Sequence, residues 1–332
     1  MAEPLLRVHE LRTWFYTEGG VAKAVDGVSF EIGAGETVGL VGESGSGKSV
    51  TALSLLRLVY PPGRIEPGSE ILFEGRNLVT LDERDMRAVR GARISMVFQE
   101  PMTVLNPVFT VGDQIAEVVR VHKGGSKREA WDRAVKMLET VGIPSPAQRA
   151  HEYPHQLSGG MRQRVVIAMA LVMNPALVIA DEPTTALDVT IQAQILDLMR
   201  NLQQEHNTAL MMITHDLGVV AGMTDRIQVM YAGHVVETAP TEELFGNPRH
   251  PYTVGLLNSI PRLDQSAKSK LNPIRGLPPD LIDLPDMCPF LPRCDYAREK
   301  CEQQNPPLLE VNSIHRAACW FWEEVSKEGP RT

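Results

Sequence analysis

Short apolar segments recur along the first 240 residues, and several of them end in glycine-rich or acidic turns. Four segments are nearly unbroken, at residues 36–41, 94–98, 175–180 and 209–214. An unbroken apolar run of this length is typical of a strand buried on both faces, as in a parallel sheet. The pattern therefore predicts an α/β fold with a parallel-sheet core.

Other segments predict a smaller antiparallel sheet and a helical region. Strands up to residue 30 and the hairpin-like residues 70–78 indicate the antiparallel sheet. A mostly helical part is expected at about residues 100–160. Helices are predicted at 50–58, 113–122, 127–141 and 241–245, and a strand and turn at 226–237.

The chain changes character beyond about residue 247. Nine of its 24 prolines lie between Pro261 and Pro307. Because proline lacks a backbone N–H and has a fixed φ, this stretch is expected to be extended and loop-rich rather than sheet or long helix. We expect residues 1–250 to form one domain and residues 251–332 a C-terminal extension.

Composition narrows the class of protein. The 332 residues allow about two domains, and 43% hydrophobic with 22% charged residues is usual for a globular chain. A net charge of -8 argues against broad nucleic-acid binding. We find no apolar run of the roughly 18 residues that a membrane span needs, and no secretory signal at the N-terminus.

Residues 42–49 (GESGSGKS) fit the phosphate-loop pattern G-x-x-x-x-G-K-[ST], with a predicted strand before them and a predicted helix after. Such a loop turns backbone N–H groups toward a phosphate, and the helix N-terminus adds partial positive charge. We expect a nucleoside triphosphate here, with Lys48 on its phosphates and the Ser49 hydroxyl on Mg²⁺. The expected contacts are Gly42, Ser44, Gly45, Ser46, Gly47, Lys48, Ser49 and Val50.

Polar residues follow the other predicted core strands. Asp181 and Glu182 end the run at 175–180, Gln99 follows 94–98, and His215 follows 209–214. Ligands bind at the carboxyl ends of parallel strands. Asp181 is therefore expected to hold Mg²⁺, helped by Gln99, and Glu182 to polarise the attacking water. His215 is a candidate to face the γ-phosphate.

Residues 157–161 (LSGGM) predict a second anion-binding turn. Ser158 is a good N-cap for a helix that runs to about Met173, where Asn174-Pro175 ends it. Gly159 and Gly160 leave backbone N–H groups exposed at the helix start. One phosphate loop and a second phosphate-binding turn indicate a shared site.

Taken in order, these motifs resemble the ABC transporter ATPase cassette over residues of about 5 to 255. The resemblance implies a P-loop NTPase fold with a RecA-like parallel-sheet core, an antiparallel β subdomain and a helical subdomain. It also implies two cassettes that dimerise head to tail, with ATP between the phosphate loop of one and Ser158, Gly159 and Gly160 of the other. Glu182 would then be the catalytic base or water anchor, and His215 the γ-phosphate switch.

Three further details bear on this resemblance. An aromatic residue that stacks on adenine is expected near the first strands, where Trp14, Phe15 and Tyr16 are candidates and Tyr16 is preferred. Met161 stands where glutamine is usual in the signature turn, a form known from peptide-importer ATPases. The segment at 101–107 lies where the family receives a membrane subunit.

Four cysteines stand at Cys288, Cys294, Cys301 and Cys319, all in the C-terminal extension. Their spacing lacks the tight pairs of most structural zinc sites, and it is not a ferredoxin spacing. Disulfides are disfavoured in a reducing cytosol. The residues alone leave a zinc site, an iron–sulfur cluster and four unliganded thiols open.

The extension from about residue 247 to Trp320 is similar to that of oligopeptide and dipeptide importer ATPases. This resemblance implies a [4Fe–4S] cluster on the four cysteines and an ATPase that couples ATP to uptake of di- and oligopeptides. It further implies a second, related ATPase subunit, two transmembrane permeases and an extracytoplasmic peptide-binding protein, at the cytoplasmic face of the bacterial inner membrane. Import of nickel or a peptide conjugate, and a soluble ABC ATPase, are the alternatives.

Overall fold

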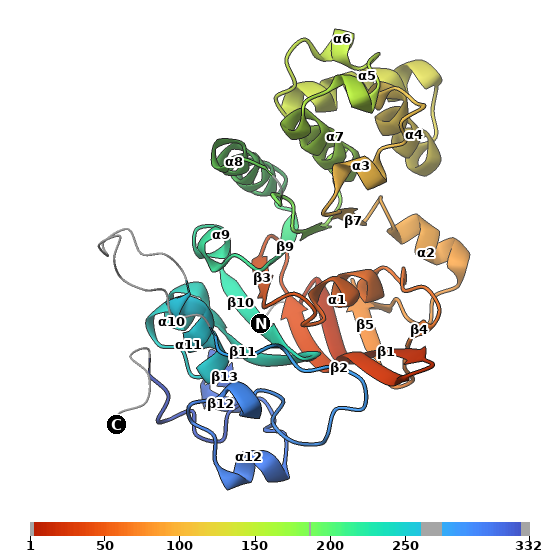
Figure 1. Cartoon of the computed structure of the whole chain (residues 1–332). Coiled ribbons are helices and arrows are strands. Elements are labelled where there is room, and N and C mark those ends of the chain that lie inside the picture. Colours follow the sequence, from red (N-terminus) through yellow and green to blue (C-terminus); the bar gives the residue numbers. More distant parts are fainter. Residues whose placement is uncertain (1–2, 186, 260–273, 327–332) are drawn as a thin grey trace. The chain divides into compact units, whose positions relative to one another are not determined.

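The computed structural model describes residues 3–185, 187–259 and 274–326. It divides into two compact units (Figure 1). The first comprises Met1–Ile32, Thr37–Val79 and Ile213–Thr332, and the second comprises Gly33–Glu36 and Thr80–Met212. The C-terminal extension therefore belongs to the same unit as the phosphate loop. The boundary predicted at residue 250 stays a prediction.

An antiparallel sheet forms one part of the first unit. Its strands are β1 (Leu6–Thr17), β2 (Gly20–Ile32), β4 (Gly63–Ile65), β5 (Glu70–Phe73) and β6 (Arg76–Asn77). The order is β2-β1-β5-β6, and β4 pairs with β1. Leu6, Val8 and Leu11 of β1 are buried, whereas Arg7 and His9 between them are exposed. This alternation gives the sheet one apolar face.

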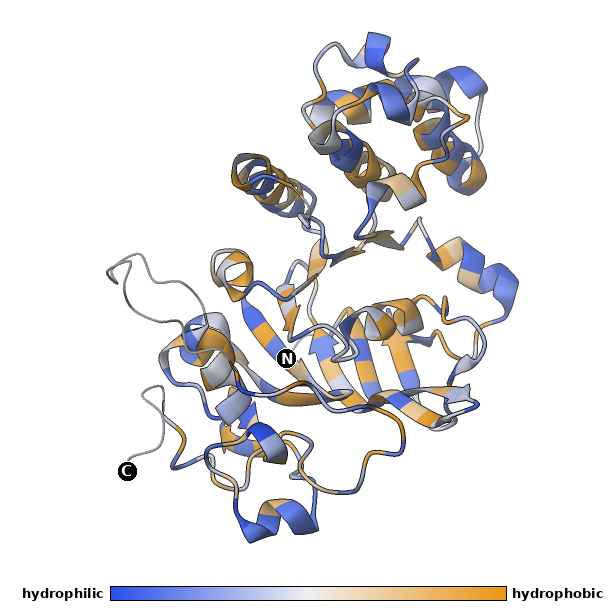
Figure 2. Cartoon of the chain, in the orientation of Figure 1, coloured by the Kyte–Doolittle hydropathy of each residue, from blue (hydrophilic) through white to orange (hydrophobic). Residues whose placement is uncertain are grey.

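A second group of strands in this unit carries the phosphate loop. Strand β3 (Thr37–Val41) is buried throughout and pairs in parallel with β10 (Arg226–Tyr231). Strand β10 pairs antiparallel with β11 (His234–Pro240) across the predicted turn. Helices α1 (Lys48–Leu55), α9 (Leu217–Ala221), α10 (Thr241–Gly246) and α11 (Pro251–Asn258) complete this part. Figure 2 shows the hydrophobic positions along these strands.

The second unit contains the predicted helical region and two core strands. Strands β7 (Ile94–Val97) and β8 (Leu177–Asp181) pair in parallel. The helices are α2 (Glu83–Val89), α3 (Pro101–Val104), α4 (Val111–Lys123), α5 (Lys127–Thr140), α6 (Pro146–Arg149), the 3₁₀ turn η1 (Pro154–Gln156), α7 (Gly159–Leu171) and α8 (Val189–His206). Strand β9 (Ala209–Thr214) runs across the boundary between the units.

Helix boundaries differ from the predicted ones by a few residues. Helix α1 begins at Lys48 and ends at Leu55, whereas residues 50–58 were expected. It ends early because Arg57 has a left-handed backbone (φ 51°), which a helix cannot continue through. Helix α7 likewise stops at Leu171 rather than at Met173, with Val172 as its C-cap.

The described part of the proline-rich stretch, residues 274–307, is loop-rich as predicted. It contains only the 3₁₀ turn η2 (Leu291–Arg293) and the short helix α12 (Glu299–Gln303). The prolines from Pro261 to Pro273 lie outside the described residues. Two strands that the sequence analysis did not predict follow this stretch, β12 (Leu309–Asn312) and β13 (His315–Ala317). They extend the sheet that contains β11, because β13 pairs with β11 and β12 pairs with β13.

A buried contact between His315 and Glu237 also holds the C-terminal extension against strand β11. His315 of β13 and Glu237 of β11 are both fully buried, and His315 Nε2 lies 2.8 Å from Glu237 Oε1. The same carboxylate accepts the backbone N–H groups of Arg249 and His250. Since a buried carboxylate is costly without partners, these contacts fix where the extension lies. No helix of the described residues has the length and apolarity of a membrane span.

Candidate nucleotide site

The phosphate loop connects β3 to α1, and its glycines are required by close packing. Gly42 has φ 154° and Gly47 has φ 103°. A Cβ atom on Gly42 would lie 2.2 Å from the carbonyl oxygen of Met230, and one on Gly47 would lie 2.2 Å from that of Ala24. Only glycine fits at these two positions. The loop is therefore shaped by the strands against which it packs.

Lys48 is held over this loop. It is the first residue of α1 and is 5% exposed. Its Nζ atom donates to the carbonyl oxygens of Gly42 and Glu43, both at 2.8 Å, and to Ser46 Oγ at 3.3 Å. These contacts place a buried positive charge beside the loop, where phosphate oxygens would be attracted to it.

The remaining loop residues differ in access to solvent. Ser44, Gly45 and Ser49 are exposed, whereas Val50 is half-buried. Nothing lies within 4 Å of a Cβ placed on Gly45. Ser44, Gly45 and Ser49 thus lie at the surface at the start of α1, where backbone N–H groups favour an anion.

The three aromatic candidates have different surroundings. The Tyr16 hydroxyl donates to Glu66 at 2.9 Å, and the Arg64 guanidinium lies 4.1 Å from the centre of the Tyr16 ring. Residues Thr13 to Phe15 of β1 pair with β4 in regular register. The side chains of Thr13 and Phe15 therefore share a face of β1. The Thr13 hydroxyl contacts Ser54 of α1 at 2.8 Å. Tyr16 stays a prediction, and the structure places Phe15 on the α1 side.

In the second unit, Gln99 and Glu182 come together. Asp181 is the last residue of β8 and is 7% exposed. Glu182, directly after it, has a left-handed backbone with φ 46°. Its Oε2 atom accepts from Gln99 Nε2 at 2.8 Å and from the Thr185 hydroxyl at 2.9 Å. Since β7 and β8 are parallel neighbours, the residues after them meet at one sheet edge.

The left-handed backbone of Glu182 is uncommon for a residue other than glycine and costs conformational free energy. Here it turns the Glu182 carboxylate toward Gln99 directly after the strand. Two neutral donors thus fix the position of the Glu182 Oε2 atom. Gln99 and Glu182 therefore lie at hydrogen-bond distance, while the roles expected of them in holding Mg²⁺ and water stay predictions.

The signature turn has the predicted cap. The Ser158 hydroxyl accepts from the backbone N–H of Met161 at 3.4 Å, at the start of α7. Ser158 and Gly159 are exposed, and a Cβ on Gly159 would have nothing within 4 Å. This helix start is open to an outside ligand. Ala186, four residues after Glu182, lies outside the described residues.

His215 follows β9 in the first unit and is exposed. The next residue, Asp216, caps α9 by accepting from the backbone N–H of Gly218 at 2.8 Å. The cap fixes the backbone after the strand end. It leaves the His215 side chain at the surface, where it can approach a nucleotide.

The four cysteines are free thiols gathered in the extension. Cys288, Cys301 and Cys319 are buried and Cys294 is half-buried. Burial, with a smaller effect from the neighbouring thiols, raises the pKa of Cys288 to about 11 and those of Cys294 and Cys319 to about 12. Within residues 3–185, 187–259 and 274–326, no three His, Cys, Asp or Glu side chains are arranged to hold a metal ion.

Two contacts at the phosphate loop were missed by the sequence reasoning. Arg293 and Tyr252 of the extension both reach Glu43, the second residue of the loop. They stand more than 200 positions away from it, and no local motif indicates the pairing. The only signal was a carboxylate inside a loop that binds phosphate.

Comparison with known proteins agrees with this site. The ABC transporter family matches residues 25–185, and the oligopeptide/dipeptide transporter C-terminal region matches residues 236–301. A putative peptide import ATP-binding protein of Brucella melitensis, BMEII0863, is 54% identical over 98% of this chain and 99% of its own. The oligopeptide transport ATP-binding protein OppD of Bacillus subtilis is 54% identical over 96% of this chain and 88% of its own.

Among solved structures, the dimeric ATP-binding cassette MJ0796, in a post-hydrolysis state with ADP and Pi bound, has a TM-score of 0.64 and 28% identity. The match covers 71% of this chain and 98% of that one. The fold is thus the ABC cassette predicted from the sequence. With its phosphate loop, acidic strand end, signature turn and C-terminal region, the chain belongs to the ATP-hydrolysing subunits of ABC transporters, in the oligopeptide/dipeptide importer family.

Proposed function

We propose that this ATPase drives uptake of di- and oligopeptides through partner permease subunits. The observation that carries the proposal is the match of residues 236–301 to the oligopeptide/dipeptide transporter C-terminal region. In addition, relatives that match most of their own length are named as peptide import or oligopeptide transport ATP-binding proteins. This region is absent from a bare cassette. A permease pair and an extracytoplasmic peptide-binding protein complete the proposed importer.

ATP hydrolysis would use the site residues predicted from the sequence. Lys48 and the loop N–H groups bind the phosphates, and Ser49, Asp181 and Gln99 hold Mg²⁺. Glu182 orients or deprotonates the attacking water, and His215 senses the γ-phosphate. The Gln99–Glu182 hydrogen bond supports this assignment, because it holds the carboxylate in a defined position.

A second ATPase subunit would complete each ATP site. The start of α7, which is exposed at Ser158 and Gly159, supports this part of the proposal, because the N-terminus of a helix offers N–H groups to a nucleotide outside the chain. Related subunits then associate head to tail. We propose a heterodimer at the cytoplasmic face of the inner membrane.

The permease contact is proposed for the segment around α3. Met102, Val108 and Phe109 are 52%, 70% and 53% exposed. Apolar side chains that lie together at a surface mark contact sites for other proteins. This position agrees with the predicted permease contact at residues 101–107.

We also propose that the extension binds a [4Fe–4S] cluster through Cys288, Cys294, Cys301 and Cys319. Support comes from the four cysteines themselves, which are free, lie together in the extension's sequence and are buried or half-buried. Buried thiolates require a cationic partner, which a cluster supplies. Binding would require the four sulfur atoms to converge.

Anaerobically purified protein is expected to contain about four iron and four sulfide per chain, with a broad absorption near 400 nm. A Cys301→Ser variant should lose most of the iron, because one of the four proposed ligands is removed. Protein with stoichiometric zinc, or without metal or sulfide, would contradict the cluster.

The importer itself is tested with the assembled complex. Two permeases, the second ATPase and the binding protein are purified with this subunit, and ATP hydrolysis is measured with a panel of solutes. Di- and oligopeptides are expected to stimulate hydrolysis several-fold, and nickel salts or single amino acids are not. If nickel salts alone stimulated ATP hydrolysis, the importer would transport nickel rather than peptides.

A further inference from the structure

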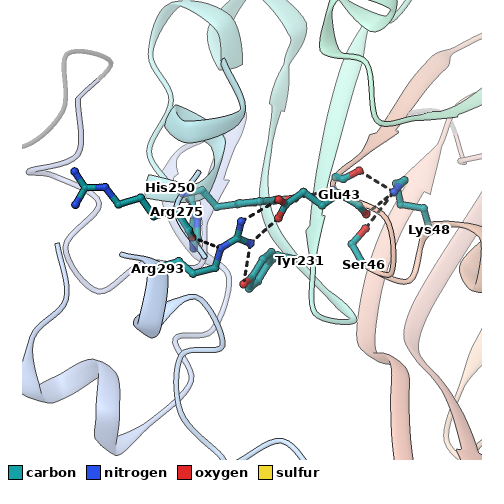
Figure 3. A network of polar contacts seen from close by, with 9 residues as sticks. Glu43, Ser46, Lys48, Tyr231, His250, Arg275 and Arg293 are labelled. Carbon is teal, nitrogen blue, oxygen red and sulfur yellow. Dashed lines mark hydrogen bonds and ion pairs between the residues drawn. The ribbon is translucent and has the colours of Figure 1, made fainter. Parts of the chain in front are cut away.

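The C-terminal extension contacts the phosphate loop directly through Arg293 (Figure 3). The guanidinium donates to both carboxylate oxygens of Glu43, with Nη1 to Oε2 at 2.6 Å and Nη2 to Oε1 at 2.9 Å. The Arg293 side chain is 4% exposed, and that of Glu43 is 29% exposed. A two-point pair of this kind fixes orientation as well as distance.

Arg293 is itself held rigidly. Its Nε atom donates to the carbonyl oxygen of Arg275 at 2.8 Å, and Nη1 also reaches the Tyr231 hydroxyl at 3.3 Å. The guanidinium carbon lies 5.8 Å from the ring centre of Phe290. All three nitrogen atoms of the guanidinium therefore have partners. The Glu43 carboxylate raises the pKa of Arg293 above its ordinary value, so the charge is permanent.

The backbone of Glu43 is held by the extension as well. Its N–H donates to the hydroxyl of Tyr252 at 2.7 Å, and Tyr252 is fully buried in α11. The Tyr231 and Tyr252 rings pack with centres 4.6 Å apart. The carbonyl oxygen of Glu43 in turn accepts from Lys48. Glu43 thus stands between an arginine of the extension and the lysine of the phosphate loop.

A carboxylate in this position opposes the loop's task. A nucleoside triphosphate brings several negative charges to the loop, and an uncompensated carboxylate beside it would repel them. Arg293 cancels that charge at hydrogen-bond distance. Repulsion would grow with the number of charges on the nucleotide, so it would affect ATP more than ADP.

We propose that Arg293 is a positioning residue of the ATP site, which neutralises Glu43 and thereby makes tight binding of MgATP depend on the C-terminal extension. The proposal rests on the ATPase activity of the chain and assigns part of it to a residue outside the cassette motifs. Arg293 ends the turn η2, where the N–H of Leu291 donates to Cys288 and that of Cys294 donates to Leu291. The neutralising charge is thus built into the cysteine segment.

The test is a double-mutant cycle on the full chain, purified anaerobically with its cysteines intact. Dissociation constants for MgATP and MgADP are measured for wild type, Arg293→Met, Glu43→Gln and the double variant. Arg316→Met, an exposed arginine of β13, is the matched control. Thermal unfolding of each protein is recorded beside the affinities.

Arg293→Met is expected to weaken MgATP binding about 10-fold or more and MgADP binding less. Glu43→Gln alone should bind MgATP at least as tightly as wild type. The double variant should return to within about threefold of wild type, because no unpaired carboxylate remains. Arg316→Met should leave both affinities unchanged.

Equal losses for both nucleotides that persist in the double variant would assign Arg293 a purely structural role and overturn the proposal. An unchanged affinity in Arg293→Met would do the same. If Arg293→Met does not fold, Glu43→Gln decides, since a loss of MgATP affinity in that variant contradicts neutralisation. Wild-type protein that bound no MgATP would instead disprove the ATPase function itself.

Discussion

Glu182→Gln is expected to slow ATP hydrolysis by about 10²–10⁴-fold while ATP still binds. Glutamine keeps the shape of glutamate, and its amide oxygen can still accept from Gln99 and Thr185 as Glu182 Oε2 does. What it loses is the negative charge that draws a proton from the attacking water. ATP should therefore stay bound and hold two ATPase subunits together, which size-exclusion chromatography with MgATP would detect.

Glu205→Gln, an exposed acid on α8 of the same unit, is the matched control and should hydrolyse ATP at the wild-type rate. Hydrolysis by Glu182→Gln at the same rate as this control would remove Glu182 from the chemistry. The assignment of the water to the end of β8 would then be wrong.

Lys48→Ala is expected to have the second largest effect. Lys48 is the buried cation of the loop, with its Nζ atom fixed by the Gly42 and Glu43 carbonyl oxygens. Removing such a charge from a transition state that carries phosphoryl charge costs about 10²–10³-fold in turnover. ATP affinity should fall as well, since the phosphates lose a direct partner.

The control for this change is Lys127→Ala, which removes an exposed lysine at the start of α5. It should alter neither hydrolysis nor affinity. A Lys48→Ala protein that keeps its thermal stability and hydrolyses ATP normally would show that the loop does not bind the γ-phosphate. Lys48→Arg should recover only part of the activity, because a guanidinium has a different shape from an ammonium.

The core of the nucleotide site could be predicted because its signals are local. The phosphate loop is one continuous motif, and glycine is required at Gly42 and Gly47, where a Cβ would clash with the backbone of Met230 and Ala24. Gln99 and Glu182 were each identified because an apolar run ends just before them, although their hydrogen bond to each other was not predicted. Parallel strands bring such ends together whatever the sequence between them.

The extension was harder to predict because its contacts are not local. Strand β13 is three residues long, which is too short for its sequence to distinguish it from a loop. It pairs with β11 because His315 lies against the buried Glu237, an arrangement that only the folded chain shows. The contact between Arg293 and Glu43 spans 250 positions, so neither residue predicts the other.

The aromatic candidates show a third limit. Residues 14–16 offer three rings in succession, and the sequence alone cannot say which side of the strand each one takes. Pairing of β1 with β4 puts Phe15 on the side of Thr13, and Tyr16 is engaged with Arg64 and Glu66. A shift of one residue in strand register moves each ring to the other face of the sheet, so the register decides which ring faces a ligand.

ATP-driven peptide uptake by the reconstituted importer tests the central claim most directly. The complete complex is placed in lipid vesicles with labelled peptide and the binding protein on the side opposite the ATPase subunits, and peptide crossing the membrane is measured with MgATP supplied to those subunits. We predict accumulation that requires MgATP and that stops with Glu182→Gln. Accumulation without ATP, or at an unchanged rate with Glu182→Gln, would contradict an importer powered by this chain.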